Sequence, residues 1–146
     1  MITPLFWECV QEEMELPSLV KNPTSKQLVK YAGASGDFYE IHYDKDFAQS
    51  TGLPGPILQG ALKSAFLGQL VTDWIGEYGI LKRLSCQYRK MDTPGAPLIC
   101  KGKVTKKYIY EGEHLVDCEI WVENSLGERT TPGEATVSLP SRKQYD

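Results

Sequence analysis

The chain has 146 residues, of which 16 are Lys or Arg and 19 are Asp or Glu, and its net charge at neutral pH is -3. A chain of this length buries about 70% of the surface that it exposes when unfolded, so we predict one domain spanning residues 1–146. The negative net charge gives no electrostatic basis for nonspecific binding to nucleic acid, and we expect small-molecule or protein partners instead.

Cysteine usage and hydropathy indicate the compartment. The four cysteines form no C-x-x-C pair, and three of them lie in strand-like segments, where a free cysteine behaves as a small apolar residue. No segment reaches the ~18 apolar residues needed to cross a bilayer, and the N-terminal MITPLFWECVQEEME lacks the basic region of a signal peptide. We therefore expect a cytoplasmic protein without disulfides, structural zinc or contact with a membrane.

The first helix signal covers PTSKQLVKYAGASG, residues 23–36. Thr24 can cap its start, and Gly33 and Gly36 are expected to end it. Its predicted apolar face consists of Leu28, Val29 and Ala32. Asp37 therefore follows directly after a helix end.

A short helix and a long one are predicted next. Asp44 can cap the short helix KDFAQST, and the Gly and Pro residues that follow terminate it. The long helix opens at Gly60, and because Gly68 lies in its middle we expect it to be buried and closely approached by another backbone. Its apolar residues cover most of the helix surface and are Leu62, Ala65, Phe66, Leu67, Leu70, Val71, Trp74 and Ile75.

Beyond residue 78 the apolar pattern changes from a helical period to alternation, which is typical of strands. The alternating sets are Ile80, Leu84, Cys86 and Tyr88, interrupted by Lys82; Leu98, Cys100 and Val104; Val116, Cys118, Ile120 and Val122; and Ala135, Val137 and Leu139. The segments YEGEH and NSLGE provide hairpin turns. About four antiparallel strands thus follow an N-terminal strand and helices, which predicts the α+β class, with an antiparallel sheet wrapped around one long central helix.

The stretch SGDFYEIHYD places Asp37 and His42 five residues apart in a non-helical segment. They can be an ordinary turn and an unrelated histidine, or a carboxylate and an imidazole that hold one water, since this pair commonly moves protons near neutral pH. Gly60 opens the apolar helix 18 residues later. An N–H at a helix start can stabilise an oxyanion, although a glycine there can equally serve backbone packing.

Other chemistry has little support in the sequence. No G-x-G-x-x-G or H-E-x-x-H motif is present, and Ala61-Leu62 stand where a P-loop needs Lys-Ser/Thr. The segment GASG lacks the spacing of a serine nucleophile elbow. We therefore predict no metal site, no nucleotide cradle and no serine triad.

The run YAGASGDFYEIHYDKDFAQSTGLPGPILQGALKSAF strongly resembles the MaoC-like, (R)-specific enoyl-CoA hydratase group of the hotdog superfamily. The similarity is close over residues 31 to 70 and extends over the rest of the chain in element order. The resemblance implies a hotdog fold in which Asp37 and His42 activate a water and the N–H of Gly60 binds the thioester oxygen. It also implies a homodimer with active sites at the interface, or a heteromeric hotdog assembly.

The chain departs from the family motif at three positions. Tyr39 and Glu40 stand where the family usually has Asn and Pro, and Gln59 stands where it usually has His. Losing the proline relaxes the turn before His42, because proline fixes φ. We expect Leu58, Gln59 and Tyr39 to contribute to substrate binding. Glu40 is either a second carboxylate near the site or an exposed loop residue, and we favour the latter.

The resemblance predicts reversible hydration of trans-2-enoyl thioesters, with CoA as part of the substrate and no separate cofactor, giving (R)-3-hydroxyacyl thioesters. The alternatives are a noncatalytic or partner-dependent acyl-CoA-binding hotdog subunit and an acyl-CoA thioesterase. Two further features are interpreted as structural. The row Lys101, Lys103, Lys106 and Lys107 is a solvated strand face or a seat for ligand phosphates, and His114 is expected in a solvated turn.

Overall fold

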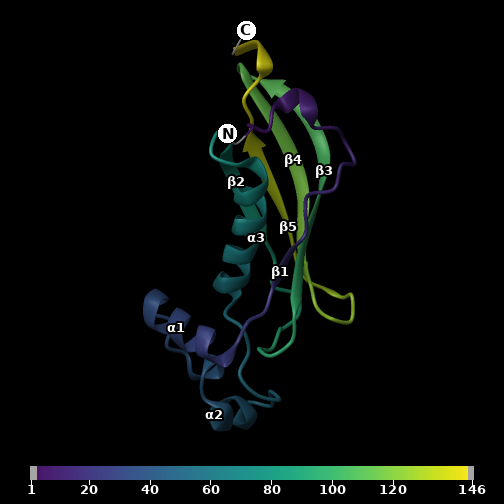
Figure 1. The fold of residues 1–146 in the computed structure, drawn as a ribbon. Coiled ribbons are helices and arrows are strands. Elements are labelled where there is room, and N and C mark those ends of the chain that lie inside the picture. The colour runs from purple at the N-terminus through teal and green to yellow at the C-terminus, as the bar shows by residue number, and fades with distance from the viewer. Residues whose placement is uncertain (1–2, 145–146) are drawn as a thin grey trace.

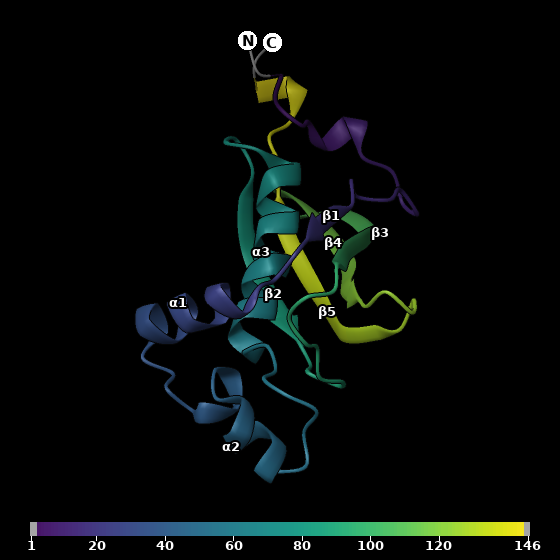
Figure 2. The same ribbon diagram turned by 60° about the horizontal axis from the view of Figure 1, so that its bottom comes forward.

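The computed structural model describes residues 3–144. One long helix, α3, lies against a curved sheet, and the shorter helices α1 and α2 lie beyond the end at which α3 begins (Figures 1 and 2). The helices and strands in chain order are β1 (Leu19–Lys21), α1 (Ser25–Ser35), α2 (Lys45–Ser50), α3 (Gly60–Ile75), β2 (Ile80–Cys86), β3 (Leu98–Tyr110), β4 (Glu113–Glu123) and β5 (Arg129–Ser138). Short 3₁₀ turns occupy Trp7–Cys9, Glu40–His42 and Arg142–Gln144.

All five strands form one antiparallel sheet in the order β1-β3-β4-β5-β2. The predicted α+β class, with an antiparallel sheet around a central helix, is therefore confirmed. Strands β3, β4 and β5 are consecutive hairpins, and β2 pairs with β5 at the far edge. Both predicted hairpin turns are present. The first has Glu111 and Gly112 at positive φ, as a tight two-residue turn requires.

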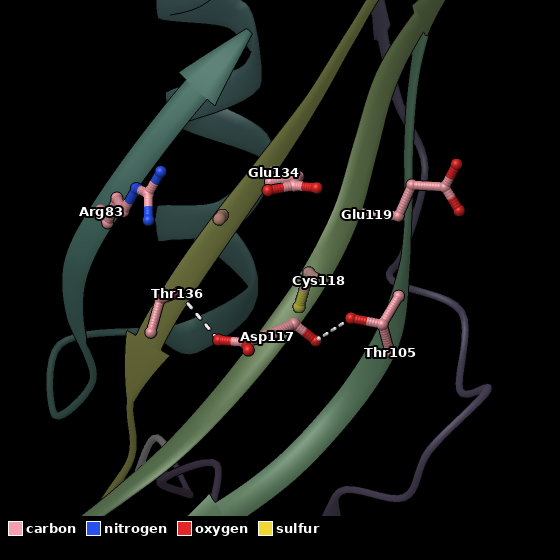
Figure 3. A pocket seen from close by; sticks show the side chains of 8 residues that line it. Arg83, Thr105, Asp117, Cys118, Glu119, Glu134 and Thr136 are labelled. Atoms are coloured by element: carbon pink, nitrogen blue, oxygen red, sulfur yellow. Dashed lines mark hydrogen bonds between the residues drawn. The ribbon is translucent and has the colours of Figure 1, made fainter.

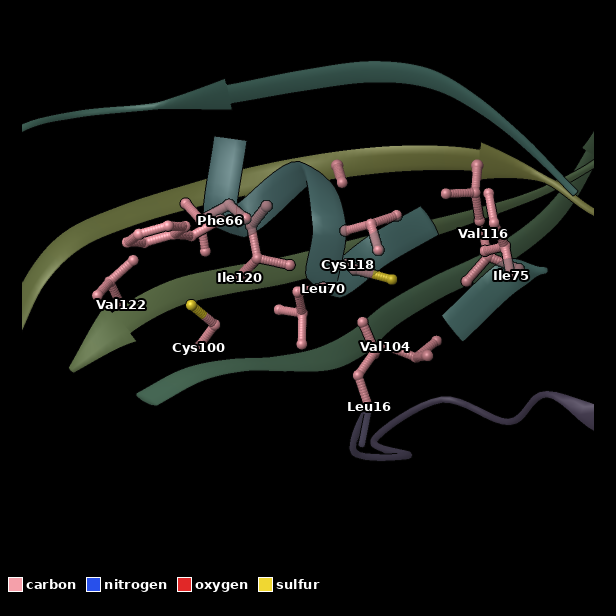
Figure 4. Close-up of a cluster of buried hydrophobic side chains, with 14 of the residues drawn as sticks. Leu16, Phe66, Leu70, Ile75, Cys100, Val104, Val116, Cys118, Ile120 and Val122 are labelled. Atoms are coloured by element: carbon pink, nitrogen blue, oxygen red, sulfur yellow. The ribbon is translucent and has the colours of Figure 1, made fainter. Parts of the chain in front are cut away.

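The core lies between α3 and the concave face of the sheet (Figure 4). The alternation predicted for β4 is confirmed, because Val116, Cys118, Ile120 and Val122 are all buried while the residues between them reach the other face. Side chains of α3, including Phe66, pack against these residues. The helix is buried on this side, which fixes the position of its first turn relative to the sheet.

The helices differ from the prediction in detail. The first helix continues through Gly33 and ends only at Gly36, which adopts the left-handed conformation with φ 77°. Val29 is exposed, because the buried stripe of this short surface helix is only as wide as Leu28 and Ala32. On α3, Ala65 is exposed and the space beside Gly68 is open, so the predicted close backbone contact at Gly68 is wrong.

Two predictions on the strands are also wrong. A bulge between Leu81 and Arg83 shifts the alternation in β2, so Ile80 is exposed and Leu81 packs on the core instead. His114 is not in the turn itself but pairs with Ile109 in the β3–β4 ladder. Its ring packs edge-on against Trp7, with 5.1 Å between the ring centroids.

The four cysteines are free thiols, and Cys100 and Cys118 are buried. Within residues 3–144, none of the helices is long and apolar enough to cross a membrane.

Candidate active site

Asp37 is positioned by the end of α1. Gly36 turns the chain out of the helix, and the backbone N–H of Asp37 donates to Ser35 Oγ at 3.2 Å. The carboxylate folds back over its own segment, where Oδ1 accepts from the backbone N–H of Tyr39 at 3.4 Å. Its other oxygen, Oδ2, faces His42. The helix end therefore holds the carboxylate while leaving half of it exposed.

His42 lies at the end of the 3₁₀ turn Glu40–His42, with only 9% of its side chain exposed against 45% for Asp37. Its Nδ1 lies 2.8 Å from the carbonyl oxygen of Ile57. A carbonyl only accepts hydrogen bonds, so in the neutral ring Nδ1 carries the proton and Nε2 presents a lone pair. Nε2 lies 3.5 Å from Asp37 Oδ2.

Two hydrogen-bond acceptors thus face the same point. Neutral Nε2 and the Asp37 carboxylate cannot bond to each other, and 3.5 Å is longer than a charge-assisted hydrogen bond. A water molecule has two O–H groups and can donate one to each acceptor. The geometry therefore suits a water held and polarised by both groups.

Gly60 is the first residue of α3, and the residue before it, Gln59, makes no side-chain cap. The first N–H groups of a helix have no partner inside the helix and carry its positive dipole end. The ring of Tyr88 packs against this glycine, such that a Cβ at position 60 would come within 2.7 Å of Tyr88 Cε2. Gly60 therefore has a packing role, and it also presents a backbone N–H that has no partner within the helix.

His42 and Gly60 line the same pocket, which has a volume of about 300 Å³. The remaining lining comes from two segments, within residues 57–63 and 88–91. The phenol of Tyr88 is hydrogen-bonded to Ser64 Oγ at 2.5 Å. Desolvation raises the pKa of Tyr88, and the Ser64 hydrogen bond acts in the opposite direction, so the phenol stays protonated at neutral pH.

Of the three residues predicted to bind substrate, one lines the pocket and a second contacts His42 without lining it. Leu58 is buried and lines the pocket, and the Tyr39 ring packs edge-on against the His42 ring, with 6.2 Å between centroids. Gln59 does not line the pocket, because it is completely buried and its Nε2 donates to the Leu28 carbonyl at 2.9 Å. Its contact ties α1 to the start of α3. Glu40 is exposed, as expected.

Sequence reasoning missed three contributors to the site: the Ile57 carbonyl, the Tyr88 ring and the buried side chain of Lys63. A backbone carbonyl leaves no mark in a sequence, and Tyr88 follows the bulged strand whose alternation was misread. Lys63 did leave a signal, as the only charged residue between Gly60 and Gln69 in the apolar helix.

The lysine row on β3 has local partners, which favours the structural interpretation. Lys101 pairs with Glu123 at 3.2 Å and Lys103 with Glu13 at 3.1 Å. Lys106 and Lys107 lie over the rings of Tyr108 and Trp7, respectively.

A second hollow, of about 190 Å³, lies over β2, β3, β4 and β5, and none of its lining residues belongs to the pocket at Gly60 (Figure 3). Its central carboxylate, Asp117, already accepts from the hydroxyls of Thr136 at 2.8 Å and Tyr108 at 3.0 Å. Within residues 3–144, no group of three or more His, Cys, Asp or Glu side chains is placed to hold a metal ion. The candidate site is therefore the pocket at Gly60.

Comparison with family models matches residues 10–124 to the MaoC like domain, and the chain belongs to this family. The sheet and helix form the hotdog fold. The (R)-hydratase from A. caviae involved in PHA biosynthesis superposes with a TM-score of 0.79 at 25% identity, over 90% of this chain and 98% of that chain.

Two relatives of known description are similar in sequence. The 3-oxo-4,17-pregnadiene-20-carboxyl-CoA hydratase beta subunit of Mycobacterium tuberculosis is 28% identical over 131 residues, which are 87% of this chain and 93% of the relative. The fatty acid synthase subunit beta of Saccharomyces cerevisiae is 30% identical over 112 residues, which are 75% of this chain but only 5% of the yeast protein. The chain thus corresponds to a small part of the fungal synthases.

Proposed function

We propose that the chain catalyses the reversible hydration of trans-2-enoyl thioesters, carried on CoA, to (R)-3-hydroxyacyl thioesters. The observation that carries the proposal is the convergence of His42 Nε2 and Asp37 Oδ2, 3.5 Å apart, beside the pocket that Gly60 opens. Membership of the MaoC-like family and the similarity to an (R)-hydratase support the reaction class. No cofactor is required, because CoA is part of the substrate.

In the proposed reaction the bound water loses a proton to the Asp37–His42 pair as its oxygen forms a bond to C3. The C2–C3 π electrons move toward C2, and negative charge develops on the thioester oxygen. The Gly60 N–H donates a hydrogen bond to that oxygen, and one such donor is typically worth ~10²–10³ in rate. The pair then returns a proton to C2, which completes the addition of water.

The decisive experiment compares Asp37→Asn and His42→Ala with wild type, following the loss of enoyl thioester ultraviolet absorbance on a panel of trans-2-enoyl-CoAs. We expect kcat to fall at least ~10²-fold in each variant, since His42→Ala removes the lone pair that faces the water and Asp37→Asn removes the charge that makes the carboxylate a base. Glu40→Gln is the matched control, because it neutralises an exposed carboxylate in the same segment. Wild-type turnover in both test variants would contradict the assignment.

The second candidate function is that of a subunit that works only within an assembly. Large apolar side chains near the site, including Phe38 and Met91, are exposed, and one relative is named a beta subunit.

We propose a homodimer as the working state, with a heteromeric hotdog assembly as the alternative. Light scattering gives the mass, and acyl-CoA binding without turnover in the isolated chain would favour the subunit role. Thiol release during the assay would instead indicate a thioesterase.

A further inference from the structure

Lys63 is the most unusual residue beside the pocket. It lies in the first turn of α3, three residues after Gly60, and only 2% of it is exposed. The positive end of the helix dipole disfavours a cation at this position, and burying an ammonium group is strongly unfavourable unless it is paired. Its Nζ donates to Asp92 Oδ2 at 3.1 Å and to the Lys90 carbonyl at 2.9 Å.

Asp92 is equally buried, with 3% exposed. Its Oδ2 accepts from the Thr130 hydroxyl of β5 at 2.6 Å in addition to Lys63. Its backbone carbonyl accepts from the N–H of Leu58 at 2.9 Å, just before α3 begins. Asp92 is therefore bonded to the sheet on one side and to both Leu58 and Lys63 on the other.

The two lysine contacts fall on one stretch of chain, residues 87–92, which we name the wall segment. Its residues 88–91 line the pocket together with residues 57–63. On the sheet side, the N–H groups of Arg89 and Lys90 donate to the Thr130 carbonyl at 3.0 and 3.1 Å. On the helix side, its attachments are the Leu58 hydrogen bond, the Lys63 ammonium and Tyr88, whose ring packs on Gly60 and whose phenol is hydrogen-bonded to Ser64 Oγ at 2.5 Å.

We propose that Lys63 and Asp92 are positioning residues whose ion pair holds the wall segment against the first turn of α3. The ammonium bridges two acceptors on the wall, and this keeps the Tyr88 ring on Gly60 and sets the width of the slot for the thioester. Stability alone does not require an ion pair here, because buried pairs are often replaced by apolar residues without loss. An apolar pair, however, would not form the directed hydrogen bonds by which Lys63 joins α3 to the wall segment.

Amide hydrogen exchange tests the tether without relying on catalysis. Lys63→Met, the charge-free double variant Lys63→Met/Asp92→Leu and the control Lys101→Met are compared with wild type. Lys101 suits as the control because its ion pair with Glu123 is on the exposed face. We expect the amides of Arg89 and Lys90 to exchange at least tenfold faster in both test variants, relative to the amides of β4, and to be unchanged in the control.

The double variant decides the result if Lys63→Met alone fails to fold, since it leaves no unpaired buried charge. Wild-type protection of the wall amides in the double variant, or a loss that β4 shares equally, would overturn the tether.

The positioning role rests on the proposed function and has a separate kinetic readout. We expect the double variant to keep a melting temperature near that of wild type while kcat on enoyl-CoA falls at least tenfold, with a smaller change in KM, because alignment matters most in the transition state. If the amides of the wall segment exchange faster but kcat is unchanged, Lys63 and Asp92 are not positioning residues. Absence of turnover in wild type would refute the proposed function, while hydrogen exchange would still decide whether the wall is tethered.

Discussion

Gly60→Ala tests whether contact between the Tyr88 ring and the helix start is part of the site. The new Cβ would lie 2.7 Å from Tyr88 Cε2 and 2.9 Å from Cδ2 and Cζ. Carbon atoms in contact are normally ~3.5–4.0 Å apart, so the ring must withdraw by about 1 Å. A displacement of that size in an active site can reduce the rate ~10²-fold. We therefore expect kcat/KM for enoyl-CoA hydration to fall about 100-fold.

Stability should not follow activity in this variant. The backbone at Gly60 has no positive φ, and alanine in a helix is favoured over glycine by roughly 0.5–1 kcal/mol, so the melting temperature should stay level or rise. Gly33→Ala, in open space on α1, is the control for this gain. The assay is a double-mutant cycle with Tyr88→Ala. With the ring absent, adding Gly60→Ala should change kcat/KM less than threefold, and a full 100-fold loss in that background would refute the reasoning.

Two predictions concern the core. Burial raises the pKa of the Cys100 and Cys118 thiols to about 12, so both should resist Ellman's reagent at pH 8 until denaturant is added, and rapid labelling of either in the native chain would contradict their burial. Leu67→Ala should lower the free energy of unfolding by ~2–5 kcal/mol in urea titrations, because Leu67 is fully buried beneath the sheet. Leu126→Ala, at a side chain that is 82% exposed, should change it by less than about 0.5 kcal/mol, and similar losses in both would show that the core is misassigned.

The fold was predictable where one physical requirement dominated the sequence. The middle of strand β4, residues 116–120, is buried on one face only, so its alternation of apolar and charged residues gives both the strand and its inward face. The apolar helix from Gly60 was predictable for the same reason, since only a core-facing element tolerates so many large apolar residues. The α+β class and the packing of one sheet on one central helix follow from these two elements.

The errors occur where a local irregularity changes the pattern. The bulge in β2 places Ile80 on the opposite face from Leu84 and Cys86. The sequence showed an interruption of the alternation at Lys82, but an interruption does not reveal that a residue is inserted. His114 was assigned to solvent because it closes a turn sequence, but its ring is covered by Trp7, more than a hundred positions earlier in the chain. Contacts of that range depend on the folded topology, which local sequence does not specify.

In the candidate site, too, the residues defined by local sequence were predictable and those defined by long-range packing were not. Asp37 and His42 were found because their spacing is local, and Gly60 because it begins an element that was itself predictable. The Lys63–Asp92 pair joins positions 29 residues apart. A lysine in an apolar helix indicates a buried partner, but several acidic residues were available, and only the packed sheet selects one of them.

The structure also explains how His42 keeps its position although Tyr39 and Glu40 replace the Asn-Pro of the family motif. A proline would fix one φ angle before the histidine. Here the 3₁₀ turn is closed by hydrogen bonds instead, from the N–H of Asp44 to the Glu40 carbonyl at 2.8 Å and from the N–H of His42 to the Tyr39 carbonyl at 3.2 Å. The imidazole itself is anchored outside this segment, by Nδ1 on the Ile57 carbonyl. Because that anchor belongs to the approach to α3, it holds the ring independently of the 3₁₀ turn. The substitution at Tyr39 instead changes what surrounds the imidazole, because the Tyr39 ring packs edge-on against it.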